Sequence, residues 1–90
     1  MIRRPAPERR PEPTDEQLLA FEAAHTPGAH TGTKEIAIRH ELGIHPARYY
    51  VLLGRLIWLE DALRIDPALT NRLRRLAIDR KAEQRRRHHT

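Results

Sequence analysis

Apolar and polar positions alternate with a helical period through most of the chain, and short runs rich in proline or glycine interrupt it. Thr14, followed three residues later by Gln17, has the spacing of a capping box and predicts the start of a helix that ends near His25. A loop follows over residues 25–33, where one proline and two glycines break the period. The later periodic segments are helical as well, so the pattern predicts an all-α bundle of four to five helices.

The second and third predicted helices meet at a glycine. Thr33 can cap a second helix over residues 34–42, and Gly43 suits the left-handed residue that ends it. The pair His45-Pro46 then starts a third helix, because proline at the first helical position loses no hydrogen bond. A short helix, a turn that tolerates positive φ and a second helix with an apolar face are the parts of a helix-turn-helix. We therefore expect this motif at the centre of the domain.

The two ends of the chain differ from its middle. Four of the seven prolines fall in residues 1–13, which have almost nothing to bury and predict a disordered arm. Near the other end, a short helical turn precedes Asp66-Pro67, which repeats the cap-and-proline start before a long final helix. The apolar seam of that helix stops near residue 78. The sequence thus predicts an arm over 1–13, a helical domain over 14–78 and a basic helical extension or tail over 79–90.

Positive charge is concentrated at the C-terminal end. Residues 67–90 hold eight Lys and Arg against two Asp and Glu, whereas residues 15–66 hold five against eight. Such a segment is either a solvated helix face or a binding surface for phosphate, and we expect phosphate; charge alone leaves RNA open beside DNA. The predicted phosphate contacts are Thr33, Lys34, Arg72, Arg74, Arg75, Arg80, Lys81, Arg85, Arg86 and Arg87, with Arg3 and Arg4 in the arm.

A projection of the third helix at about 100° per residue separates its faces. Tyr49 and the leucines near it point inward, and Arg48 and Arg55 share a narrow outer edge. Tyr50 lies between, so packing within the domain and contact with DNA are both open for it. The residues predicted to reach bases or the groove are His45, Ala47, Arg48, Tyr50 and Arg55.

The side of the third helix opposite the core is apolar. Val51, Gly54 and Trp58 fall there. Trp58 either packs under the final helix or contacts a partner, since tryptophan is enriched where interfaces bind most strongly. The alternative to DNA binding is therefore a protein-interaction module, in which this side docks on a second copy or on a protein of the transcription machinery such as polymerase or a sigma factor.

The central segment also resembles a known family. "KEIAIRHELGIHPARYYVLLGRLI", followed by "DPAL" and "RLRRL", is similar to small actinobacterial and actinophage proteins catalogued as a domain of unknown function and described as helix-turn-helix. The resemblance covers about residues 14–80. The resemblance implies a helix-turn-helix fold and suggests DNA binding. Together with the charge pattern and the central motif, it leads us to expect a transcriptional or phage-type regulator whose partner is double-stranded DNA.

Other classes of function find little support in the sequence. There is no cysteine, and His25 with His30 and His40 with His45 are five residues apart, so neither pair shares one helix face as metal ligands would. We expect no metal, no cofactor and no small-molecule substrate. No glycine-rich phosphate loop or nucleophile with a base is present, so we expect no enzyme. Without an apolar run of about 18 residues or a signal peptide, we expect a cytoplasmic, nucleoid-associated protein.

Overall fold

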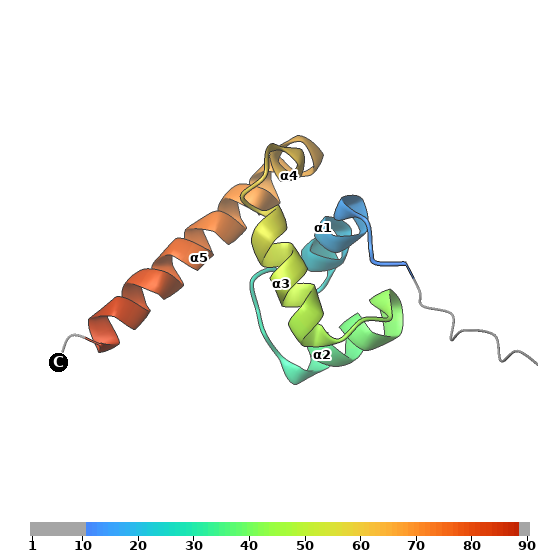
Figure 1. The fold of residues 1–90 in the computed structure, drawn as a ribbon, viewed down its shortest axis with the longest axis horizontal. Helices are drawn as coiled ribbons and strands as arrows, with labels where there is room; N and C mark the ends of the chain where they lie inside the picture. Colours follow the sequence, from blue (N-terminus) through green and yellow to red (C-terminus); the bar gives the residue numbers. More distant parts are fainter. Residues whose placement is uncertain (1–10, 89–90) are drawn as a thin grey trace, which may run out of the picture.

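A computed structural model describes residues 11–88 (Figure 1). This part of the chain contains helices and connecting turns but no strand, which confirms the predicted all-α fold. In chain order the elements are α1 (Asp15–Ala24), α2 (Gly32–Ala37), the π-helical segment η1 (Ile38–Leu42), α3 (Pro46–Leu56), α4 (Glu60–Ile65) and α5 (Pro67–Arg87). Most of the predicted arm, including Arg3 and Arg4, lies outside the described residues.

Side-chain caps set several of these boundaries as predicted. Thr14 and Gln17 form the complete capping box of α1. His45 and Asp66 each accept a backbone hydrogen bond at the start of α3 and α5, where a proline follows. Gly43 has φ 67°, in the left-handed region that glycine enters without a steric penalty. These local features start α1, α3 and α5 and end η1 at a left-handed glycine.

The start of the second helix differs from its prediction. Thr31, not Thr33, is the N-cap of α2, and its hydroxyl accepts a 3.2 Å hydrogen bond from the backbone N–H of Lys34. Thr33 is an exposed residue of the first turn. The helix then widens into η1, so its last turn is π-helical, which the periodic pattern does not predict.

The core forms where α1 packs against α3 and α4, and α4 packs against α5. Tyr49 is completely buried, which confirms its predicted place in the core. The other buried apolar residues are Leu18, Leu19, Phe21, Ile38, Leu53, Leu56, Ile57, Ala62, Leu69 and Leu73. They come from every helix of the described part except α2, and this shared burial supplies the main drive for folding.

The final helix, α5, is a single uninterrupted element of 21 residues. At 1.5 Å per residue it is about 31 Å long. Its first half packs on the rest of the domain, while its second half extends away from it as an arm (Figure 1). Helical structure therefore continues through the basic segment after residue 78, where the apolar seam ends.

Candidate nucleic-acid interface

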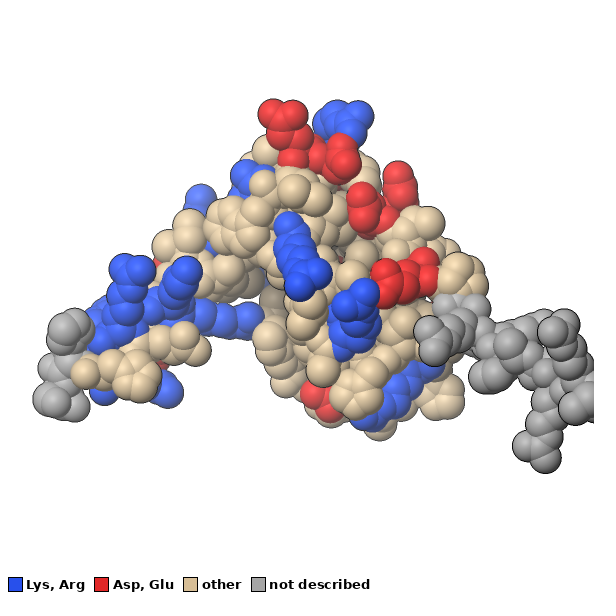
Figure 2. Space-filling model, in the orientation of Figure 1, with Lys and Arg blue, Asp and Glu red and all other residues tan. Residues whose placement is uncertain are grey.

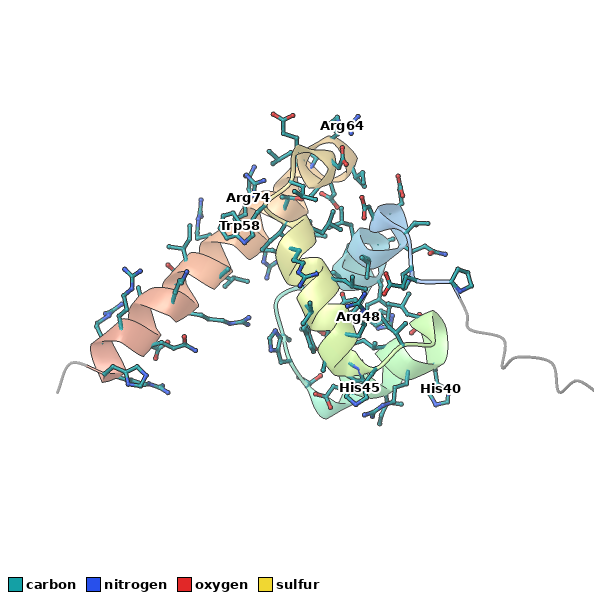
Figure 3. All side chains as sticks on the ribbon, in the orientation of Figure 1. His40, His45, Arg48, Trp58, Arg64 and Arg74 are labelled. Atoms are coloured by element: carbon teal, nitrogen blue, oxygen red, sulfur yellow. The ribbon has the colours of Figure 1, made fainter. Side chains whose placement is uncertain are left out.

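The outer face of α3 is open along its length. Arg48, Val51 and Arg55 are exposed on it, and Trp58 follows in the turn after the helix (Figure 3). Val51 is 45% exposed and Trp58 is 52% exposed. Because Tyr49 and the leucines of α3 fill the inner face, this outer face is available to a partner without any rearrangement of the core.

The two arginines of this face differ in their partners. Arg48 forms an ion pair with Glu12, and about half of each side chain is exposed. Such a surface pair contributes about 0–1 kcal/mol, so Arg48 can exchange it for a phosphate or a base at little cost. Arg55 is exposed and makes no ion pair within residues 11–88. Both positive charges can therefore be directed outward.

Lys34, predicted to contact phosphate, is instead buried, with 3% of its surface exposed. Its Nζ lies 2.7 Å from Glu22 Oε1 and donates to the carbonyl oxygens of Thr26 and Ala29. The prediction was wrong because Lys34 lies one helical turn before the buried Ile38, on the face that packs against α1. Its charge is thus neutralised inside the domain.

Glu22 is the centre of this buried polar cluster. Besides Lys34, it accepts a 2.6 Å hydrogen bond from the hydroxyl of Tyr49 and a 2.7 Å bond from the backbone N–H of Gly28. Burial, and then the hydrogen bond to Glu22, raise the pKa of Tyr49 far above its ordinary value. The cluster joins α1, α2 and α3 to the loop between α1 and α2, so it holds the first half of the interface in place.

Sequence reasoning missed this cluster, although a signal for it exists. Glu22 lies four residues after Leu18, and Lys34 lies four residues before Ile38. In both helices the charged residue therefore shares a face with a core residue. Opposite charges on two inward faces indicate a buried pair, because either charge alone would be costly to bury.

Tyr50, predicted to contact the groove, points into the domain instead. Its ring lies 4.2 Å from the ring of His30, centroid to centroid, and its buried hydroxyl has no hydrogen-bond partner within residues 11–88. Burial raises the pKa of Tyr50 above its usual value. Of the two roles left open for this residue, packing within the domain is the one observed, with its ring against His30 of the loop.

Arg74 is also committed within the domain. Its guanidinium donates to the backbone carbonyls of Ile57 and Leu59, and it lies 5.5 Å from the centre of the Trp58 ring (Figure 3). Such a cation–π contact contributes about 0.5–1 kcal/mol at an exposed site. Arg74 therefore anchors α5 to the turn after α3, which argues against its predicted contact with phosphate. Trp58 is 52% exposed and contacts α5 through Arg74.

Arg80 links the second half of α5 to the loop before α2. Its guanidinium donates to the carbonyl of Gly28, and Nη1 lies 3.2 Å from Nε2 of His30. Burial, followed by the positive charges of Arg80 and Lys34, lowers the pKa of His30 below its usual value of 6.5. Arg80 is exposed, so it remains within reach of a partner.

Charge is separated across the visible face of the molecule. Lys and Arg gather along the arm of α5 and over α3, whereas Asp and Glu gather over α4 and the start of α1 (Figure 2). Of the predicted phosphate contacts, Thr33 is exposed on α2. The exposed basic residues of α5 are Arg72, Arg75, Arg80, Lys81, Arg85, Arg86 and Arg87. Arg87 also forms an ion pair with Glu83, one turn earlier. Exposed basic residues therefore occur along the whole length of α5, with the exposed acidic residues Asp79 and Glu83 among them.

A family model covers residues 12–88, which is nearly the whole of the helical part, and its description reads protein of unknown function, DUF3263. The chain belongs to DUF3263. No curated protein and no solved structure matched it. The family assignment agrees with the resemblance to a domain of unknown function, and it leaves the activity of this DUF3263 protein to be inferred from its own surface.

The part of this DUF3263 protein that the structure describes has neither a metal-binding cluster nor a membrane-spanning helix. Within residues 11–88, no three side chains of the metal-binding types come together as a cluster. No helix in the same range has both the length and the apolar composition needed to cross a bilayer.

Proposed function

We propose that this DUF3263 protein is a helix-turn-helix regulator that binds double-stranded DNA. The supporting observation is that Arg48 and Arg55 lie on the open face of the helix that follows the left-handed turn at Gly43. In a helix-turn-helix the second helix enters the major groove, where arginine recognises guanine through two hydrogen bonds. The small residue before Arg48, Ala47, allows the helix backbone to approach the base edges there.

The arm of α5 supplies non-specific affinity in this proposal. Its exposed arginines and Lys81 suit phosphate, and arginine makes the bidentate contacts that phosphate favours. His45 and Thr33 lie at the starts of α3 and α2, where helix-turn-helix proteins contact the backbone. With about five cations on phosphates, the slope of log K against log salt concentration is about −4.5. This steep slope separates phosphate binding from weak surface attraction.

A titration of random-sequence duplex against salt concentration tests the electrostatic part. We expect binding at about 50 mM salt and a slope near the value given above. Absence of binding at that salt concentration would contradict the proposal. Under the same conditions, single-stranded RNA that binds more tightly than the duplex would favour an RNA-binding role.

Variants of α3 test the recognition part. Once a preferred site has been selected from random DNA, Arg48→Ala and Arg55→Ala should each lower the preference for that site by about 1–3 kcal/mol and weaken random binding less. Arg64→Ala is the matched control, because Arg64 is an exposed arginine on α4 paired with Asp61 and distant from α3's outer face (Figure 3). If all three substitutions changed the preference for the selected site equally, α3 would not be the helix that recognises the DNA sequence.

A further inference from the structure

An apolar pocket lies in the angle between α3 and α5. Its volume is about 140 Å³, and most of its wall is hydrophobic. Leu53 and Ile57 of α3 form one side, Leu73 and Leu76 of α5 form the other, and Tyr50 closes the end next to the loop. Cavities of about this size in apolar cores hold a benzene ring, so the pocket has room for one phenyl side chain.

Gly54 lies at this pocket and has no evident role in the packing of the chain. A Cβ placed on it would meet nothing within 4 Å. Glycine in the interior of a helix is disfavoured relative to alanine, and here no turn or positive φ requires it. Its absence of a side chain leaves this edge of the pocket open to an incoming group. Trp58, one turn further on, adds exposed aromatic surface beside it.

The charges around the pocket are positive. Arg80 forms part of its wall, and Arg74, which follows the lining residue Leu73, lies over Trp58. Glu22 also lines the pocket, but its carboxylate is already bound to Lys34. A second copy docked with the twofold axis through the pocket would bring these arginines close to their own equivalents. An acidic partner has the complementary charge.

We propose that this pocket is the docking site for an acidic peptide segment of another protein, which inserts one phenylalanine between α3 and α5. The phenyl ring enters beside Gly54, and a carboxylate next to it in the peptide faces Arg80. This partner surface is separate from the contacts of Arg48 with DNA, so the protein can connect a bound duplex to an acidic protein. The site adjoins the apolar face formed by Val51, Gly54 and Trp58 and shares only Gly54 with it.

The probe for this site is a fluorescently labelled synthetic peptide of alanine and glutamate with one central phenylalanine. Fluorescence anisotropy measures its binding to the full chain. Replacing the phenylalanine with alanine should weaken binding at least about tenfold, because the apolar contact is lost. Replacing every glutamate with lysine should abolish it. Equal binding of the phenylalanine and alanine peptides would overturn the proposal, since charge alone would then explain the association.

Two matched variants place the peptide on the chain. Gly54→Phe puts a ring at the mouth of the pocket and should abolish binding, whereas Val51→Phe puts the same ring on the exposed face outside the lining residues and should leave it within about threefold. Circular dichroism establishes that both variants remain folded. If Gly54→Phe fails to fold, Gly54→Leu replaces it. Equal loss in the two variants, or no loss in either, would refute the assignment of the pocket.

Two other occupants are tested with the same proteins. Sedimentation that shows a dimer of the parent chain, lost in Gly54→Phe, would replace the acidic partner with a second copy. Loss of duplex binding in Gly54→Phe together with peptide binding would make the pocket part of the DNA surface. For Gly54→Phe we expect duplex binding to be retained and peptide binding to be lost. Peptide binding by a chain that fails to bind duplex would support the pocket and refute DNA binding independently.

Discussion

Replacement of Lys34 by methionine tests the buried polar cluster around Glu22, which joins α1, α2 and α3. Methionine has a similar length but no charge, so Lys34→Met leaves the Glu22 carboxylate buried without its cation. Breaking a buried ion pair on one side costs about 3–5 kcal/mol. Tyr49 and the N–H of Gly28 still donate to Glu22, so we expect a value near the lower end, about 3 kcal/mol.

The chain contains its own control for this measurement. Lys81 is the only other lysine and is exposed on α5, so Lys81→Met should change stability by no more than about 0.5 kcal/mol. Urea unfolding followed by circular dichroism measures both. A domain of this size has a stability of about 4–12 kcal/mol, so a loss of about 3 kcal/mol is large and measurable.

A second variant protects the test against simple failure to fold. In the double variant Glu22→Gln with Lys34→Met no buried charge remains, and replacing a buried pair by neutral residues is often close to neutral. We expect it to recover at least half of the stability lost by Lys34→Met alone. The reasoning would be refuted if Lys34→Met were as stable as Lys81→Met. It would also be refuted if the double variant were less stable than Lys34→Met alone.

Three further outcomes follow from the same structure. In acetylation of the native protein with mass spectrometry, Lys81 should react quickly and Lys34 slowly; equal rates would contradict its burial. Thr31→Ala should lower the free energy of unfolding by about 1 kcal/mol and Thr33→Ala by much less, because Thr31 caps α2. A larger loss in Thr33→Ala than in Thr31→Ala would show that Thr33 is the cap instead. The lowered pKa of His30 means that the unfolded chain binds a proton more readily than the folded chain, so this residue makes stability fall as pH decreases through and below 6.5. In urea unfolding, the free energy of unfolding of His30→Gln should fall less between about pH 7 and pH 5 than that of the parent chain. An equal fall in the two proteins would contradict this.

The residues predicted to contact DNA differ in whether another segment of the chain covers them. Ala47, Arg48 and Arg55 lie on the outer face of α3, as the helical projection predicts. Tyr50 lies near the boundary between faces, and only the position of the loop residue His30 determines that it turns inward. The projection of a single helix contains no information about what the neighbouring segments cover.

The sequence alone determined the elements that depend on neighbours in the chain. The capping box at Thr14, the left-handed Gly43 and the proline starts of α3 and α5 are local, because each involves residues within a few positions of one another. Their physical cause, the unpaired backbone groups at helix ends, is present in the sequence itself.

Only the tertiary structure decided which charges are buried and which are free. Lys34 and Glu22 are twelve residues apart and Arg80 is a further 46 residues along the chain, yet all three hold the loop between α1 and α2. A charged side chain is stable inside a domain only with a partner, and that partner comes from another element. The pocket between α3 and α5 arises in the same way, because its two walls meet only when the helices pack.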